Sequence, residues 1–240
     1  MTVIQIHGDF DKVEKLLQGQ ITSDINLLVN NGYQLSSICN QKGEVIAGFM
    51  IHKAENYKIL IDHWLVDIFI DELNPFAKFF DVTFSQESGL IYGTVSLEKQ
   101  DKAFFSNEVF SLSITLEKSE LTETLLKDDW IAANKLALNF DIGKDDIGKF
   151  RPLEINYDKT RVAFDKGCFR GQEIIARMKY LGVNRRKFVT IINADLIEES
   201  KNLRIIGKIT KYKNFYIFNS LMNRDFFEEF ALSYPEAEII

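Results

Sequence analysis

The chain has 240 residues, of which 46% are hydrophobic and 27% charged, and its formal net charge is −6. This composition is typical of a globular protein with one large domain or two small ones, and it excludes a fibrous or disordered chain. Two cysteines, Cys39 and Cys168, are too few for a disulfide-rich secreted scaffold and indicate a reducing compartment. The sequence lacks an apolar run of about 18 residues, the length needed to cross a membrane, and residues 1–15 lack the features of a signal peptide.

Basic residues are concentrated in one segment of this acidic chain. Residues 161–187 contain eight basic side chains against only Asp165 and Glu173, so the segment carries +6 and the other 213 residues carry −12. The eight are Arg161, Lys166, Arg170, Arg177, Lys179, Arg185, Arg186 and Lys187. Such a stripe predicts one anionic partner at one place, and the alternative is an ordinary solvated surface strip.

The first half of the chain alternates strand-like and helix-like segments. Asp9 is expected to cap a helix that ends at Gly19, and a second helix over 63–80 is expected to break near Pro75. A third helix is expected from Ser119 to Asn139. We expect strands over 3–7, 33–39, 45–52, 57–62, 81–86, 90–97 and 109–116, with a hairpin turn at 40–43.

The second half reads as loop, helix and then strands. Residues 141–160 are polar and contain Gly and Pro, which predicts a loop, and 171–180 reads as a helix. Strand-like segments follow at 188–192, 204–210 and 214–218. This mixed order predicts an α+β fold with antiparallel sheets. A change of composition near Arg185 predicts a body over 1–185 and a short C-terminal β subdomain over 186–240.

Metal and nucleotide sites are not indicated by this sequence. The three histidines, His7, His52 and His63, are scattered, and neither a Cys-x-x-Cys pair nor a glycine-rich phosphate loop is present. We therefore expect no metal ligands.

The segment 164–173 contains the highest concentration of candidate functional residues. Gly167 and Gly171 bracket Cys168, and Lys166 and Arg170 flank it at two residues on either side. Cations and a following helix N-terminus stabilise a thiolate, so Cys168 is a candidate reactive thiol. The alternative for a free cysteine is a buried small apolar residue, which suits Cys39 better.

The start of the same helix offers an anion-binding arrangement. Free backbone N–H groups at a helix start bind carboxylates or phosphates. Glu173 and Arg177 share a helix face, either as a surface ion pair or with Arg177 free to bind an anionic ligand through two hydrogen bonds.

These residues resemble a known family. Residues 166–173, KGCFRGQE, resemble the K-G-C-[FY]-x-G-Q-E signature of the YgfZ family of folate-binding proteins, relatives of the glycine-cleavage T-protein, an aminomethyltransferase. The resemblance continues over 174–177 and to Gly182 and Arg185. Upstream, residues 17–24 and 39–43 resemble the family's L-Q-G-Q and C-x-x-K-G segments, so the resemblance covers about residues 1–190.

The resemblance implies a fold and a role. The fold is a T-protein-like α+β body with ferredoxin-like elements, followed by a β-barrel-like subdomain. The role is that of a cytoplasmic accessory protein that binds tetrahydrofolate, free or polyglutamylated, and supports the assembly or repair of iron–sulfur enzymes, including those that modify tRNA. Cys168 is then the functional thiol with Lys166 as its cationic neighbour. The implied folate-pocket positions are Gly167, Gly171, Gln172, Glu173 and Arg177.

Two departures from the family pattern keep other functions open. Only 55 residues follow Arg185, which is short for a full barrel and predicts a truncated one. The T-protein's N-x-x-x-x-K-D stretch is replaced by residues 59–67, where Asp67 lacks the preceding lysine, so aminomethyl transfer is the less favoured alternative. A tRNA-binding module without chemistry is the second alternative, although Phe169 and Tyr180 are the only exposed aromatic residues expected along the basic stripe.

Overall fold

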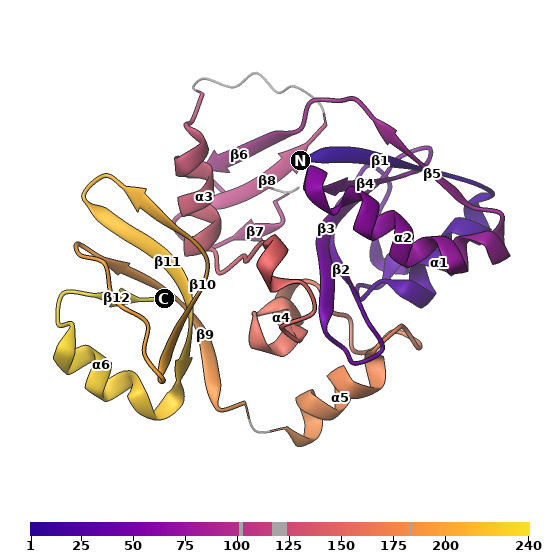
Figure 1. The fold of residues 1–240 in the computed structure, drawn as a ribbon. Coiled ribbons are helices and arrows are strands. Elements are labelled where there is room, and N and C mark those ends of the chain that lie inside the picture. Colours follow the sequence, from indigo (N-terminus) through magenta and orange to yellow (C-terminus); the bar gives the residue numbers. More distant parts are fainter. Residues whose placement is uncertain (101–102, 117–123, 183) are drawn as a thin grey trace.

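The computed structural model describes residues 1–100, 103–116, 124–182 and 184–240. Over these ranges the chain folds into three antiparallel sheets with helices packed against them (Figure 1). Within the same ranges, helices long and apolar enough to cross a lipid bilayer are absent.

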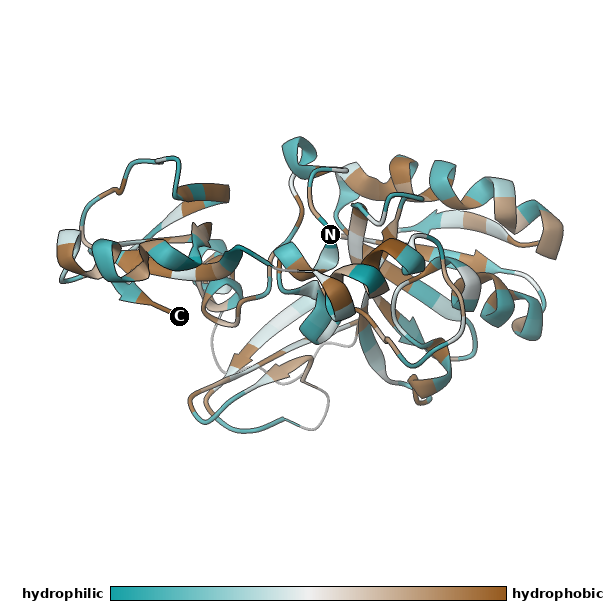
Figure 2. Ribbon diagram, turned by 90° about the horizontal axis from the view of Figure 1, so that it is seen from below, coloured by the Kyte–Doolittle hydropathy of each residue, from teal (hydrophilic) through white to brown (hydrophobic). Residues whose placement is uncertain are grey.

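The first sheet forms the N-terminal half, with strand order β2-β3-β4-β1-β5. Its strands are β1 Thr2–His7, β2 Tyr33–Cys39, β3 Val45–Lys53, β4 Tyr57–Ile61 and β5 Thr83–Glu87. The amphipathic helices α1, Phe10–Gln20, and α2, Val66–Ala77, bury their apolar residues against it (Figure 2). Asp9 caps α1 as predicted, because its carboxylate accepts a hydrogen bond from the backbone N–H of Lys12.

The expected break at Pro75 is wrong. Helix α2 continues through Pro75 to Ala77 and passes into a 3₁₀ turn at Lys78–Phe80. Proline removes one backbone donor from a helix. Pro75 and Asp71, whose carbonyl loses that donor, are both exposed, so water can satisfy the free carbonyl.

A second sheet packs on the remaining face of the first. It contains β6 Tyr92–Ser96, β7 Phe105–Ser106 and β8 Ser111–Thr115, in the order β6-β8-β7. Ile114 of β8 contacts the first sheet in a cluster with Leu35, Met50 and Leu60. Helix α3, Lys127–Leu136, covers this sheet, and Trp130 lies directly over Gly93. The expected helix start at Ser119 lies outside the described residues.

The connecting segment is largely irregular, as predicted, but contains short turns of helix. These are 3₁₀ turns at Lys144–Asp146 and Pro152–Glu154 and the helix α4, Tyr157–Thr160. A loop then leads to α5, Gln172–Leu181. The hydroxyl of Tyr157 donates to the backbone oxygen of Phe140 at 2.8 Å, which fixes α4 against the segment that follows α3.

The third sheet is C-terminal and has the order β10-β11-β9-β12. Its strands are β9 Arg186–Asn193, β10 Leu203–Tyr212, β11 Phe215–Asn223 and β12 Glu238–Ile239. One face packs on the body through Phe188, Ile206 and Leu221, and the other is covered by α6, Phe227–Ser233. In the part of the chain that the structure describes, β10 and β12 do not pair, so this sheet is open rather than a closed barrel.

Candidate functional site

The loop before α5 presents Cys168 to solvent. Cys168 and Gly167 are exposed, whereas Lys166 and Phe169 on either side are buried and Arg170 is half-buried. The loop is therefore held by the residues that flank the thiol. Cys39 is completely buried, and desolvation raises its pKa to about 12.

Lys166 fixes one end of this loop from inside the protein. Its ammonium donates to the backbone oxygens of Ile21, at 2.9 Å, and Ser23, at 2.8 Å, and lies 5.2 Å from the ring centre of Phe169. Desolvation lowers its pKa to about 8, opposed by the nearby charge of Asp24. The charge of Lys166 is thus directed at main-chain carbonyls.

Arg170 fixes the other end of the loop. Its Nε donates to the backbone oxygen of Cys39 at 2.6 Å, and its Nη1 pairs with the Glu72 carboxylate at 2.8 Å. The guanidinium therefore ties the loop to the end of β2 and to α2. Its Nη2 is buried without a hydrogen-bond partner among the described residues.

The glycines predicted at two separate motifs meet at this point. Gly171 has a φ of 82°, and a Cβ there would lie 2.5 Å from the backbone oxygen of Asn40 and 2.9 Å from the Cα of Gly43. The hairpin turn 40–43 and the loop before α5 are consequently in backbone contact. At Gly167, by contrast, a Cβ would have open space.

Helix α5 turns its charged residues outward. The side chains of Glu173 and Arg177 are 85% and 66% exposed, and they pair only loosely with each other at 3.8 Å. An exposed pair of this kind contributes little to stability. Gln172 is half-buried at the first turn of α5.

Three of the eight cations of segment 161–187 are buried or half-buried, so they do not belong to a solvated surface stripe. The side chain of Arg161 is 2% exposed and that of Arg170 is 13% exposed, and Lys166 is buried. Most of the hydrogen bonds of these three cations go to backbone carbonyls. The charge pattern along the sequence does not distinguish such buried cations from exposed ones. Arg177, Lys179, Arg185, Arg186 and Lys187 are exposed.

Arg161 is the centre of a polar cluster that sequence reasoning did not identify. Its Nη1 donates to the backbone oxygens of Ser36, at 3.1 Å, and Phe49, at 2.9 Å. Its Nη2 donates to Asn139 at 2.9 Å and lies 3.7 Å from the Asp141 carboxylate. Its Nε is buried and lacks a partner among the described residues.

Asp141 gives this cluster a water-accessible carboxylate in desolvating surroundings. Its side chain is 64% exposed, yet desolvation by the surrounding protein raises its pKa, opposed by Arg161 and reinforced by Asp62. The chain's amino group lies 3.9 Å from Asp62.

Lys135 is the second cation that acts on Asp141. It is buried on α3, and its ammonium donates to Asn219 of β11 at 3.2 Å. Desolvation lowers its pKa to about 8, opposed by Asp141. The cluster therefore joins distant parts of the chain: Asp62 just after β4, α3, the segment 139–141, Arg161 and the C-terminal sheet.

The sequence held a weak signal for this cluster. Asn134 and Lys135 occupy buried positions on α3, where an amphipathic helix normally carries apolar residues. Asp67, considered as a catalytic acid from the sequence, is exposed on the first turn of α2, whereas Asp62 contributes to the field at Asp141.

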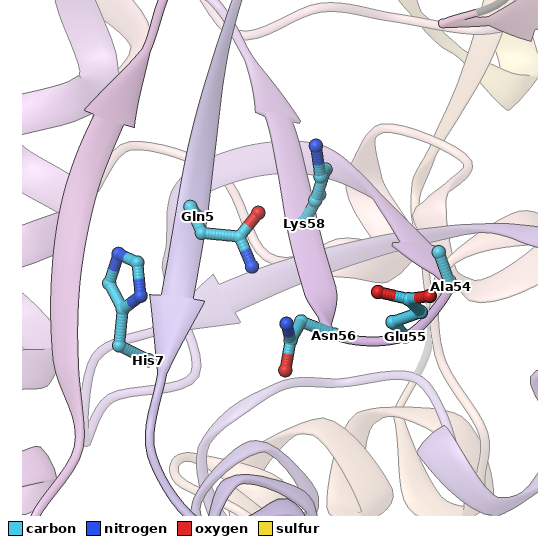
Figure 3. A pocket seen from close by; sticks show the side chains of 6 residues that line it. All are labelled: Gln5, His7, Ala54, Glu55, Asn56 and Lys58. Carbon is cyan, nitrogen blue, oxygen red and sulfur yellow. The ribbon is translucent and has the colours of Figure 1, made fainter.

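Two surface pockets lie elsewhere. One, of about 370 Å³, is lined by β1, β4 and the turn before β4, and Figure 3 shows the six side chains that line it. The other, of about 290 Å³, lies along α1 and includes Asn26. Neither includes a residue of the Cys168 loop or of the Arg161 cluster.

Comparison with known proteins identifies the family. The chain is 31% identical over 193 residues to an uncharacterised protein of Haemophilus influenzae, a match that covers 77% of this chain and 68% of that one. It is 29% identical over 208 residues to the tRNA-modifying protein YgfZ of Photorhabdus laumondii and 30% identical over 208 residues to that of Buchnera aphidicola. The chain belongs to the YgfZ family.

The YgfZ matches cover 72% of this chain in each case, and 63% and 65% of the two relatives. The chain therefore spans somewhat less than two thirds of the length of these curated YgfZ relatives. No protein-family model matches it.

The fold expected from the resemblance is confirmed. The crystal structure of the glycine cleavage system aminomethyltransferase T from Bartonella henselae superposes with a TM-score of 0.62. The match covers 94% of this chain and 76% of that one, at 14% sequence identity. At this identity the likeness shows the fold alone.

The two cysteines should differ sharply in reactivity. Because Cys168 is exposed whereas Cys39 is buried with a pKa near 12, iodoacetamide at pH 8 should alkylate only Cys168 in the native protein. Peptide mass spectrometry before and after unfolding in guanidinium measures this. Native-state labelling of Cys39 at a similar rate would contradict the packing described for β2.

Gly171→Ala should destabilise the fold. The left-handed backbone and the contact with the 40–43 turn together make the expected loss roughly 2–4 kcal/mol of unfolding free energy, measured by urea denaturation. Gly167→Ala is the matched control, because open space at its Cβ position predicts a change within about 0.5 kcal/mol. Equal effects of the two substitutions would argue against the interlocked turn.

Proposed function

We propose that this YgfZ-family chain is a folate-binding accessory protein that supports the assembly or repair of iron–sulfur enzymes, including enzymes that modify tRNA. The proposal of folate binding rests on one polar cluster that joins the first sheet, α3 and the C-terminal sheet. Its members are Arg161, Asp141, Asp62 and Lys135. The name "tRNA-modifying protein" of its relatives supports the link to tRNA modification. Its cysteines are free, which is consistent with a reducing compartment such as the cytoplasm.

The side chains of this cluster fit a reduced pterin. A pterin ring presents an amino group and a ring N–H beside a carbonyl oxygen, so it needs both acceptors and donors. Asp141 supplies an acceptor that both solvent and a ligand can reach. Arg161 and Lys135 are buried, so they act on a ligand through the positive charge that they place near Asp141.

Binding would orient the folate by charge and hydrogen bonding. Tetrahydrofolate, when bound, supplies the N5 and N10 atoms that carry one-carbon units. Arg161 holds Asp141 in place from one side, and its own position is fixed by the carbonyls of β2 and β3. A polyglutamate tail is anionic, and the exposed cations Arg177, Lys179 and Arg185 are suitable partners for it.

The proposed thiol function uses the Cys168 loop. Cys168 is exposed, while Lys166 and Arg170 fix the loop on each side of it and Gly171 keeps its backbone against the 40–43 turn. A thiol held on a rigid loop is presented to a client protein in one orientation. Gly167, Gln172 and Glu173 complete the segment, and we propose that they contact the folate or the client.

One-carbon transfer is a second candidate. It is favoured by Asp141, because a carboxylate of raised pKa next to bound folate is suited to acid–base work. It is disfavoured by the missing Lys-Asp pair at residues 59–67. Turnover of a methylamine-type donor in the presence of tetrahydrofolate distinguishes the two functions, and the accessory role requires none.

Tetrahydrofolate should raise the melting temperature of the protein. At a hundredfold excess over Kd, a ligand contributes about 2.7 kcal/mol to stability, which corresponds to roughly 5–10 °C for a chain of this size. Asp141→Asn should remove most of this shift, measured by differential scanning fluorimetry. Asp145→Asn, at an exposed neighbouring position, should retain it. The absence of a shift in the unaltered protein at millimolar folate would overturn the folate proposal.

Cys168→Ser should impair iron–sulfur enzymes in cells without unfolding the protein. In a strain that lacks the native protein, the variant should restore less of an iron–sulfur tRNA-modifying activity than the unaltered chain does. Tetrahydrofolate should still raise the variant's melting temperature, because Cys168 is not part of the Arg161 cluster. Full restoration by the variant would exclude the thiol from the mechanism.

A further inference from the structure

The hairpin of β10 and β11 is the most basic part of the chain outside segment 161–187. Residues 204–224 contain five cations and no Asp or Glu, on a chain whose net charge is −6. The cations are Arg204, Lys208, Lys211, Lys213 and Arg224. The hairpin belongs to the C-terminal sheet, which lies at the left in Figure 1, away from the first sheet. This charge is separate from the Cys168 loop and from the Arg161 cluster.

Aromatic rings and lysines gather at the tip of the hairpin, with Tyr212 and Phe215 on one face of it and Lys211 and Tyr216 on the other. The pair Tyr212 and Phe215 lies opposite across the two-residue turn, and Lys211 lies opposite Tyr216. Phe215 is 47% exposed, and both tyrosines are half-buried. Tyr216 packs against the edge of the apolar core, in which Ile217 and Phe218 are the next buried residues of β11, whereas Phe215 lies outside it.

The lysines of the tip are not neutralised within the described protein. Lys208, Lys211 and Lys213 are exposed, and no described carboxylate lies within 4.0 Å of their ammonium groups. Two of them lie beside rings instead. The Nζ atom of Lys213 is 5.4 Å from the ring centre of Tyr212, and that of Lys211 is 5.5 Å from the ring centre of Tyr216.

The turn holds a lysine in a conformation that favours glycine. Lys213 has a φ of 54°, and this left-handed region is costly for a residue that carries a Cβ. The result is a charged side chain at the tip of the hairpin, between two aromatic residues. Strained backbone at an exposed, chemically distinctive position is consistent with a functional surface.

Neighbouring cations and exposed rings match the chemistry of an unpaired nucleic-acid strand. Phosphates bind lysine ammonium groups, and bases stack on aromatic faces. A duplex offers the phosphates but hides the faces of its bases. We propose that the β10–β11 hairpin binds unpaired nucleotides of an RNA, with Tyr212 and Phe215 as stacking residues and Lys208, Lys211 and Lys213 as phosphate contacts. This inference rests on the proposed connection to tRNA modification.

Fluorescence anisotropy with a labelled single-stranded 12-nucleotide RNA tests the hairpin in the full chain. The unaltered protein should bind, and its affinity should fall as the salt concentration rises. In a plot of the logarithm of the binding constant against the logarithm of the salt concentration, each phosphate contact should contribute about −0.7 to the slope. Lys208→Gln, Lys211→Gln and Lys213→Gln together should reduce that slope by about 2. The matched control, Lys15→Gln, Lys78→Gln and Lys99→Gln, changes the same total charge at exposed positions on other parts of the chain.

The aromatic residues give a readout that general charge attraction does not. Tyr212→Leu and Phe215→Leu keep apolar bulk but remove the stacking faces. Each should weaken RNA binding by roughly 5- to 150-fold and leave the salt slope unchanged. Retention of the tetrahydrofolate-induced rise in melting temperature shows that each variant is folded and that the folate site is intact.

Several results would overturn the inference. They are no RNA binding by the unaltered protein, an equal loss in the control triple variant, binding of a blunt RNA duplex as tightly as of the single strand, or tighter binding of single-stranded DNA than of RNA. Hairpin-dependent binding to phosphatidylserine vesicles in place of RNA would also overturn it and would assign the hairpin to a lipid surface. Loss of RNA binding with an intact folate response would leave the proposed folate function standing.

Discussion

The buried guanidinium of Arg161 is the interaction on which the site depends. A charge in the interior is tolerated only when it is paired and hydrogen-bonded. Arg161 meets this condition through carbonyl oxygens of two neighbouring strands, the side chain of Asn139 and the ring of Tyr157, whose centre lies 4.5 Å away. These contacts fix the position of Arg161 relative to the first sheet, and Asp141 then lies beside a cation that cannot move away.

Cations bonded to main-chain carbonyls also hold the Cys168 loop in place. Lys166 and Arg170 also direct their charges at main-chain carbonyls, of residues 21 and 23 in one case and of Cys39 in the other. Three cations of one short segment thus bind the loop and the preceding turn to β2, α2 and the end of α1. These bonds fix the two ends of the loop on which the thiol of Cys168 is exposed.

The features proposed to be functional lie in different parts of the chain, although Lys135 connects the Arg161 cluster to Asn219 of β11. The Arg161 cluster lies where the sheets meet, Cys168 lies on the loop before α5, and the basic hairpin belongs to the C-terminal sheet (Figure 1). This arrangement is compatible with the proposed function, which requires a small molecule and a larger partner to be bound at the same time. It also means that a substitution in one place leaves the others available as controls.

Local sequence patterns determined most of the elements. The strand 33–39, the turn 40–43, the cap at Asp9 and the three long C-terminal strands all follow from side-chain periodicity and turn residues that act over a few positions. The family resemblance also rests on contiguous residues, such as 166–173. Pro75 was misjudged because the cost of a proline depends on whether solvent reaches the carbonyl it leaves free.

Tertiary structure alone decided which charges face inward. The hydrogen bonds of Arg161 to Ser36 and Phe49 join residues separated by 125 and 112 positions, and the bond of Lys135 to Asn219 joins residues separated by 84. A linear pattern gives a buried arginine and an exposed one the same appearance, because the carbonyls that satisfy the buried one come from distant strands. The sequence therefore identified the family, and its prediction for Cys168 stays a prediction, whereas the cluster around Asp141 depends on contacts that only the folded sheets bring together.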